Sequence, residues 1–101
     1  MKLSVFERLM LLSILPAEGD IITIRIRREL RDALSFSEAE NKKLDFERDE
    51  EGIHWNQDAD CSKDVVIGKK ARELIVEALE ELAEAKKFTD QHLDVYDRFM
   101  K

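Results

Sequence analysis

The stretch Ile21–Leu34, IITIRIRRELRDAL, decides the fold, because it fits two kinds of secondary structure. At its start isoleucine alternates with threonine or arginine, which is typical of a β-strand. Over its whole length, one helical face collects five apolar residues: Ile22, Ile26, Leu30, Ala33 and Leu34. The helical pattern accounts for more residues, so we predict a helix from about Thr23 to Ser35 with Thr23 as its N-cap. A strand stays the alternative.

Capping signals predict further helices on both sides of this stretch. Ser4 and Glu7 form a capping-box pattern before an almost wholly apolar helix that Pro16 ends. Ser37 and Glu40 repeat the pattern before a short helix that extends to about residue 44. The clearest apolar stripe covers 69–85, and a last short helix follows the predicted cap residue at 89.

Short strands are predicted between these helices. Phe46–Arg48 and Ile53–Trp55 flank a polar turn in which Gly52 takes a positive φ angle, as expected of a β-hairpin. Asp64–Ile67 is a plausible third strand. The order predicts an α+β fold: a mostly helical single domain over residues 1–101 with a small antiparallel β-sheet. Three helices followed by a hairpin also give a winged-helix-like outline.

The net charge of −6 lies entirely in residues 36–64, which hold ten acidic and four basic side chains. The other 72 residues hold 13 of each. A concentrated field of one sign acts on partners and encounter rates rather than on the fold. We therefore expect a protein partner of basic character. The candidate partner-binding residues are Glu38, Glu40, Glu47, Asp49, Glu50 and Glu51.

One basic cluster lies on the predicted helix over 23–35 and consists of Arg25, Arg27, Arg28 and Arg31. Winged-helix proteins that read DNA present a basic surface, so a nucleic-acid-binding regulator is the alternative function. However, Glu29 and Asp32 stand at ion-pairing spacing on the same helix. The acids of the predicted third helix and hairpin would also repel phosphate. We expect a solvated or ion-paired face and consider nucleic acid the weaker alternative.

Three further cations, Lys69, Lys70 and Arg72, open the helix predicted over 69–85. Cations are unfavourable at the positive end of a helix, so we expect these side chains to pair with the acidic segment. The preceding glycine does not make a phosphate-binding loop, because the first glycine of that motif and its Ser or Thr are missing.

Residues that could support catalysis or bind a metal are scarce. His54, Cys61 and His92 have neither the number nor the spacing of a zinc site, and no oxyanion-hole loop accompanies them. We expect no enzyme activity, no cofactor and no metal. One cysteine fits a reducing compartment, and the most apolar stretch, Leu9–Leu15, is too short to cross a bilayer. We therefore expect a cytoplasmic protein without membrane contact.

Four segments together resemble small, uncharacterised proteins encoded in bacteriophage and prophage genomes: Leu15–Asp20, Leu34–Glu38, His54–Asn56 and Ile67–Lys70. The resemblance covers most of the chain and implies action inside a bacterial host cell or an assembling virion. It assigns no activity and no site residues. We expect a phage-type accessory protein that binds a protein stoichiometrically, for example as an inhibitor of a host protein. A virion or assembly component, with a homodimer as one form, is a further alternative.

Overall fold

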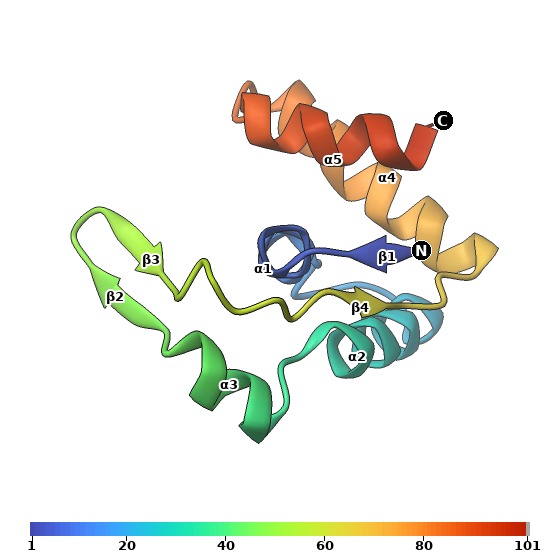
Figure 1. The fold of residues 1–101 in the computed structure, drawn as a ribbon. Coiled ribbons are helices and arrows are strands. Elements are labelled where there is room, and N and C mark those ends of the chain that lie inside the picture. Colours follow the sequence, from blue (N-terminus) through green and yellow to red (C-terminus); the bar gives the residue numbers. More distant parts are fainter. Residues whose placement is uncertain (101) are drawn as a thin grey trace.

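The computed structural model describes residues 1–100 and has the α+β architecture that the sequence predicts (Figure 1). The helices are α1 (Val5–Ile14), α2 (Ile21–Leu34), α3 (Glu38–Leu44), α4 (Lys69–Glu84) and α5 (Asp90–Met100). The strands are β1 (Lys2–Leu3), β2 (Glu47–Asp49), β3 (Gly52–His54) and β4 (Lys63–Asp64). Helices therefore dominate, and the strands form only two short antiparallel pairs.

The ambiguous stretch is the helix α2, which rules out the alternative strand. The helix begins at Ile21, two residues before the predicted start, and its N-cap is Asp20 and not Thr23. The Asp20 carboxylate accepts the backbone N–H of Thr23 at 2.7 Å, and this hydrogen bond lowers the pKa of the Asp20 carboxyl group. The helix buries Leu30 and Leu34 against the core.

The other predicted caps are present. Ser4 and Ser37 each accept the backbone N–H of the glutamate three residues later, and each glutamate accepts the backbone N–H of its serine in return. Both capping boxes are therefore complete. At the start of α5, the hydroxyl of Thr89 accepts the backbone N–H of His92 at 3.3 Å.

The strands differ from the prediction in their pairing. β2 and β3 form the expected hairpin, with Arg48 opposite Ile53 and Gly52 at a φ of 125°. The predicted third strand over Asp64–Ile67 is wrong except at Asp64, because the observed strand β4 is Lys63–Asp64. It pairs with β1 and not with the hairpin. The pairing continues beyond the two strands, because the backbone N–H of Val65 donates to the Met1 carbonyl at 2.8 Å. The single small sheet that we expected is thus two separate strand pairs.

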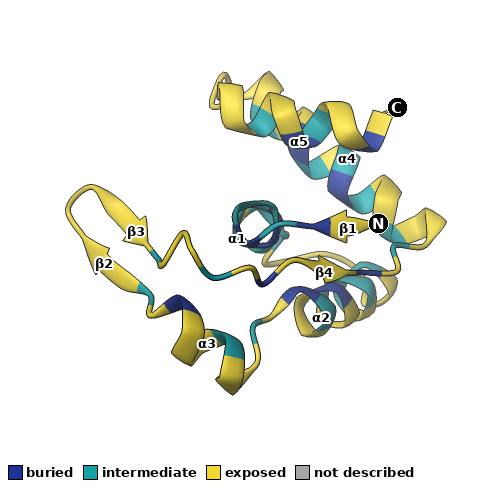
Figure 2. Cartoon of the chain, viewed as in Figure 1, coloured by how far each residue is buried: buried dark blue, intermediate teal, exposed yellow. Residues whose placement is uncertain are grey.

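The core divides into a main cluster and a smaller one. The main cluster joins α1, α2, α4 and α5 around fully buried residues such as Leu11 and Leu79. The smaller cluster is built on Val5, Leu44 and Cys61, with the aromatic rings of residues 36, 46 and 55 packed against it. It holds α3 and the base of the hairpin to the body, whereas the hairpin strands beyond this base are exposed (Figure 2).

Candidate functional site

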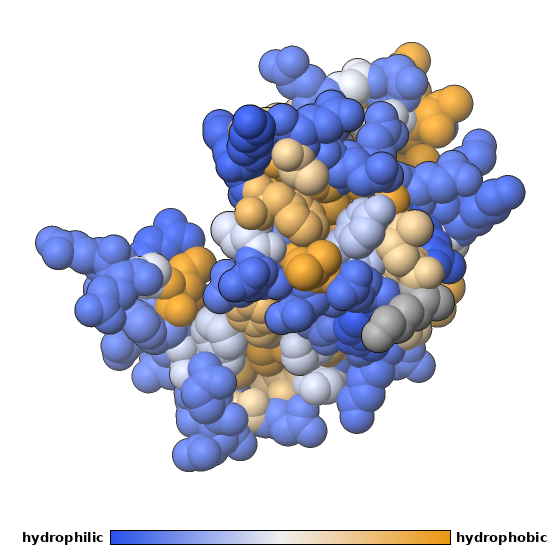
Figure 3. Space-filling model, turned by 90° about the horizontal axis from the view of Figure 1, so that it is seen from above, coloured by the Kyte–Doolittle hydropathy of each residue, from blue (hydrophilic) through white to orange (hydrophobic). Residues whose placement is uncertain are grey.

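The β2–β3 hairpin, residues 47–54, forms an arm that extends away from the helices (Figure 1). We call it the acidic arm. Every residue of its two strands is exposed. Its surface is largely hydrophilic (Figure 3), and its acids are Glu47, Asp49, Glu50 and Glu51. Four of the six predicted partner-binding residues therefore share one projecting element.

The turn of the acidic arm is organised by Asp49. Its Oδ1 atom accepts the backbone N–H of Glu51 at 2.8 Å and lies 3.1 Å from Nε2 of His54. The hydrogen bond from Glu51 is the main cause of a lowered pKa of the Asp49 carboxyl group, with His54 contributing. The carboxylate thus stays ionised and holds the tip in shape, while Glu50 remains exposed in the turn.

The two remaining predicted residues lie on α3, apart from the arm. Glu38 is exposed at the first residue of α3, at the opposite end of the helix from the connection to β2. Glu40 is different, because its side chain is only 22% exposed and its carboxylate faces Arg8. The Glu40 carboxylate is thus already bound by the buried Arg8, and its role in partner binding stays a prediction.

Arg8 is a fully buried arginine that joins four segments of the chain. Its guanidinium donates to the backbone carbonyls of Leu34 at 3.1 Å, Ser35 at 2.6 Å and Cys61 at 3.0 Å. The same group lies 4.0 Å from the centre of the Phe36 ring, a cation–π distance. Arg8 therefore ties α1 to the α2–α3 connection and to the loop before β4.

Glu40 completes the hydrogen bonding of Arg8. The Arg8 Nη1 atom donates to Oε2 at 2.7 Å and Nη2 donates to Oε1 at 3.2 Å, which is a bidentate ion pair. The hydrogen bond from Arg8 lowers the pKa of the Glu40 carboxyl group to about 2. Sequence reasoning missed this pair. A lone arginine in an almost wholly apolar helix was the available signal, because a buried charge requires a partner.

The basic cluster of α2 does not pair with acids. Arg25, Arg28 and Arg31 are exposed, and Arg27 is half-buried with its Nε atom lacking a hydrogen-bond partner. Within residues 1–100, none of the four has a carboxylate oxygen within 4.0 Å. Of the two predicted arrangements, solvated or ion-paired, the structure shows the solvated one for Arg25, Arg28 and Arg31.

The cations that open α4 also differ from the prediction. Across the described part of the chain, Lys69 and Lys70 have no carboxylate within 4.0 Å, so their expected pairing with the acidic segment is wrong. Arg72 instead donates to the backbone carbonyl of Phe99. The positive start of α4 therefore faces solvent, and its third cation links α4 to α5.

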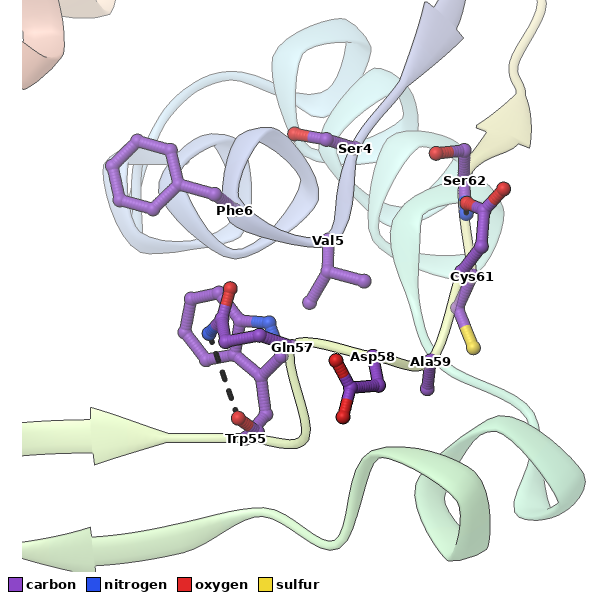
Figure 4. Close-up of a pocket in the computed structure, with 10 residues that line it drawn as sticks. Ser4, Val5, Phe6, Trp55, Gln57, Asp58, Ala59, Cys61 and Ser62 are labelled. Atoms are coloured by element: carbon purple, nitrogen blue, oxygen red, sulfur yellow. Dashed lines mark hydrogen bonds between the residues drawn. The ribbon is translucent and has the colours of Figure 1, made fainter.

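A cavity of about 320 Å³ lies beside the base of the acidic arm, between α1 and the loop that follows β3 (Figure 4). Phe6 and Trp55 contribute aromatic side chains, and the Gln57 amide donates to the Trp55 carbonyl at 3.5 Å. Cys61 lines the cavity but is nearly buried. No histidine lines this cavity, and the titratable side chains that line it beside Cys61 are the carboxylates of Asp58 and Asp60. Residues 1–100 also contain no cluster of three or more potential metal ligands.

Comparison with known proteins assigns neither a family nor an activity to this chain. The chain matches no protein-family model, no curated protein and no solved structure. Among residues 1–100, every helix is too short or too polar to cross a membrane.

Proposed function

We propose that this protein acts by stoichiometric binding of another protein through the acidic arm. The observation that carries the proposal is that the arm stands free of the core with both strands exposed. A two-stranded hairpin is marginal by itself, so an arm that buries none of its strand residues adds little to folding. Its acids instead present a concentrated negative field at some distance from the body.

The partner that fits this arm is a protein with a basic surface. Complementary charge raises the rate of encounter and excludes partners of the wrong sign. The turn around Asp49 is fixed by internal hydrogen bonds, which reduces the conformational entropy lost on binding. Such a role suits an accessory protein of the phage type that the sequence resemblance implies, with inhibition of a host protein as one example of it.

Charge reversal of the arm tests the proposal. In a pull-down from a bacterial lysate, the wild-type protein should capture a partner that the triple variant Asp49→Lys, Glu50→Lys, Glu51→Lys does not retain. The matched control is Glu73→Lys, Glu77→Lys, Glu80→Lys on the exposed face of α4. It changes the net charge by the same amount and should keep the partner. Equal capture by the arm variant, or none by the wild type, would contradict the proposal.

Nucleic-acid binding is a second candidate, because the exposed arginines of α2 lack carboxylate partners. Phosphate contacts give a binding constant that falls steeply with salt. Titration of the protein into duplex DNA at several salt concentrations would measure this slope. The Arg25→Glu, Arg28→Glu variant should reduce both affinity and slope. Absence of binding at ~50 mM salt, where such contacts are strong, would remove this candidate.

A further inference from the structure

A groove of about 410 Å³ lies between α2 and the start of α4. Ile26 and Ala33 of α2 line its apolar side, and Val66 contributes a side chain that is 93% exposed. Lys69 and Lys70 line the groove at the first turn of α4. The groove thus combines an apolar lining with two cations.

The start of α4 makes this groove more positive than the lysines alone would. Gly68 is the N-cap and supplies no side-chain acceptor, so the positive end of the helix is not neutralised by a cap. Neither lysine has a carboxylate within 4.0 Å in residues 1–100. Glu29 is the one acid that lines the groove. An acidic segment with an apolar side chain therefore suits it.

The acidic arm has this chemistry. Its turn carries Asp49, Glu50 and Glu51, and the neighbouring Ile53, which is 38% exposed, shares its face of the hairpin with one cation, Arg48. The arm and the groove lie on opposite sides of the molecule: in Figure 1 the arm extends to the left, while α2 and the start of α4 lie to the right. The arm is short and its turn is held by hydrogen bonds, so it cannot fold back into the groove of its own chain.

We propose that the groove between α2 and α4 receives the acidic arm of a second copy of this chain. The acids of the arm contact Lys69 and Lys70, and Ile53 packs against the apolar lining near Val66. The inference rests on the proposed function in one respect, which is that the arm is the element that binds. Because the two surfaces differ, the contact is heterologous and links copies head to tail into rings or open chains. Its small area makes the association weak and dependent on concentration.

Sedimentation of the full chain over a concentration series tests this contact. The wild-type protein should rise above its monomer mass of 11.8 kDa as concentration increases. The arm variant Asp49→Lys, Glu50→Lys, Glu51→Lys and the groove variant Lys69→Glu, Lys70→Glu should each remain monomeric. The variant that combines all five changes restores opposite charges and should associate again. Val66→Ser should associate less than the wild type because the exposed apolar surface is reduced.

Two results would overturn the inference. The first is a wild-type protein that stays monomeric up to ~1 mM, a concentration at which even weak contacts form. The second is a groove variant that associates like the wild type. Neither result contradicts the proposed function, which the pull-down judges separately. The groove variant retains the acidic arm and should still capture a basic partner, whereas the arm variant should lose both activities.

Discussion

The guanidinium of Arg8 in α1 and the carboxylate of Glu40 in α3 form a bidentate ion pair between residues that are 32 positions apart in the sequence. Arg8 is fully buried, so its charge is costly without a counter-ion. Glu40 also closes the capping box of α3 by accepting the backbone N–H of Ser37 at 2.9 Å. The Glu40 carboxylate therefore both caps the N-terminus of α3 and links α3 to α1.

Removing the charge of Glu40 should destabilise the whole domain. Glu40→Gln leaves the buried guanidinium of Arg8 without its counter-ion, and breaking a buried pair from one side costs roughly 3–5 kcal/mol. Urea unfolding at pH 7 measures the loss. The matched control Glu38→Gln changes an exposed acid two residues away and should shift the free energy of unfolding by less than about 0.5 kcal/mol. Similar effects of both variants would contradict the assigned role.

Acid should weaken the protein through the same carboxylate. The pKa of Glu40 is about 2 in the folded protein against a usual 4.5, so the unfolded chain binds this proton first as pH falls. The stabilisation is fully present above pH 4.5 and is lost as pH falls from 4.5 towards 2. Unfolding free energies of wild type and Glu40→Gln should therefore converge over this range. A difference that stays constant with pH would disprove the linkage.

The N-cap of α2 can be tested by two alanine substitutions. Asp20→Ala removes the acceptor of the Thr23 backbone N–H and should lower the free energy of unfolding by about 1 kcal/mol. Thr23→Ala removes no cap and should cost less than about 0.5 kcal/mol. Thermal unfolding of both variants gives the comparison. The reverse order of stability would favour Thr23 as the cap.

Disruption of the acidic arm should leave the rest of the domain folded. Gly52→Ala places a side chain at a φ of 125°, which L-residues rarely adopt, so the turn should be strained. Because the exposed strands contribute little to the core, we expect hydrogen-exchange protection to fall only in residues 47–54. Amides of α1 and α4 should exchange as in the wild type. Loss of protection throughout the domain would mean that the arm supports the core.

Local sequence patterns predicted most of the helices. The capping boxes at Ser4 and Ser37 and the apolar stripe of α4 depend on neighbours within a few residues, which the sequence contains directly. The start of α2 was misplaced because Asp20 and Thr23 are both good caps and the apolar pattern does not choose between them. For the candidate site, the sequence located the acids of the arm. It did not show that one of the other candidate acids, Glu40, binds the buried Arg8.

The sequence by itself determined the helices other than α2, the hairpin turn and the concentration of negative charge in residues 36–64, because each depends on short-range preferences or on counting. Only the tertiary structure decided that Glu40 pairs with Arg8, that β4 pairs with β1, and that Lys69, Lys70 and the arginines of α2 have no carboxylate partner in residues 1–100. Each of these outcomes depends on which residues distant in the sequence come close together in the fold. Burial of Arg8 makes its partner essential, whereas exposed charges in water gain little from pairing.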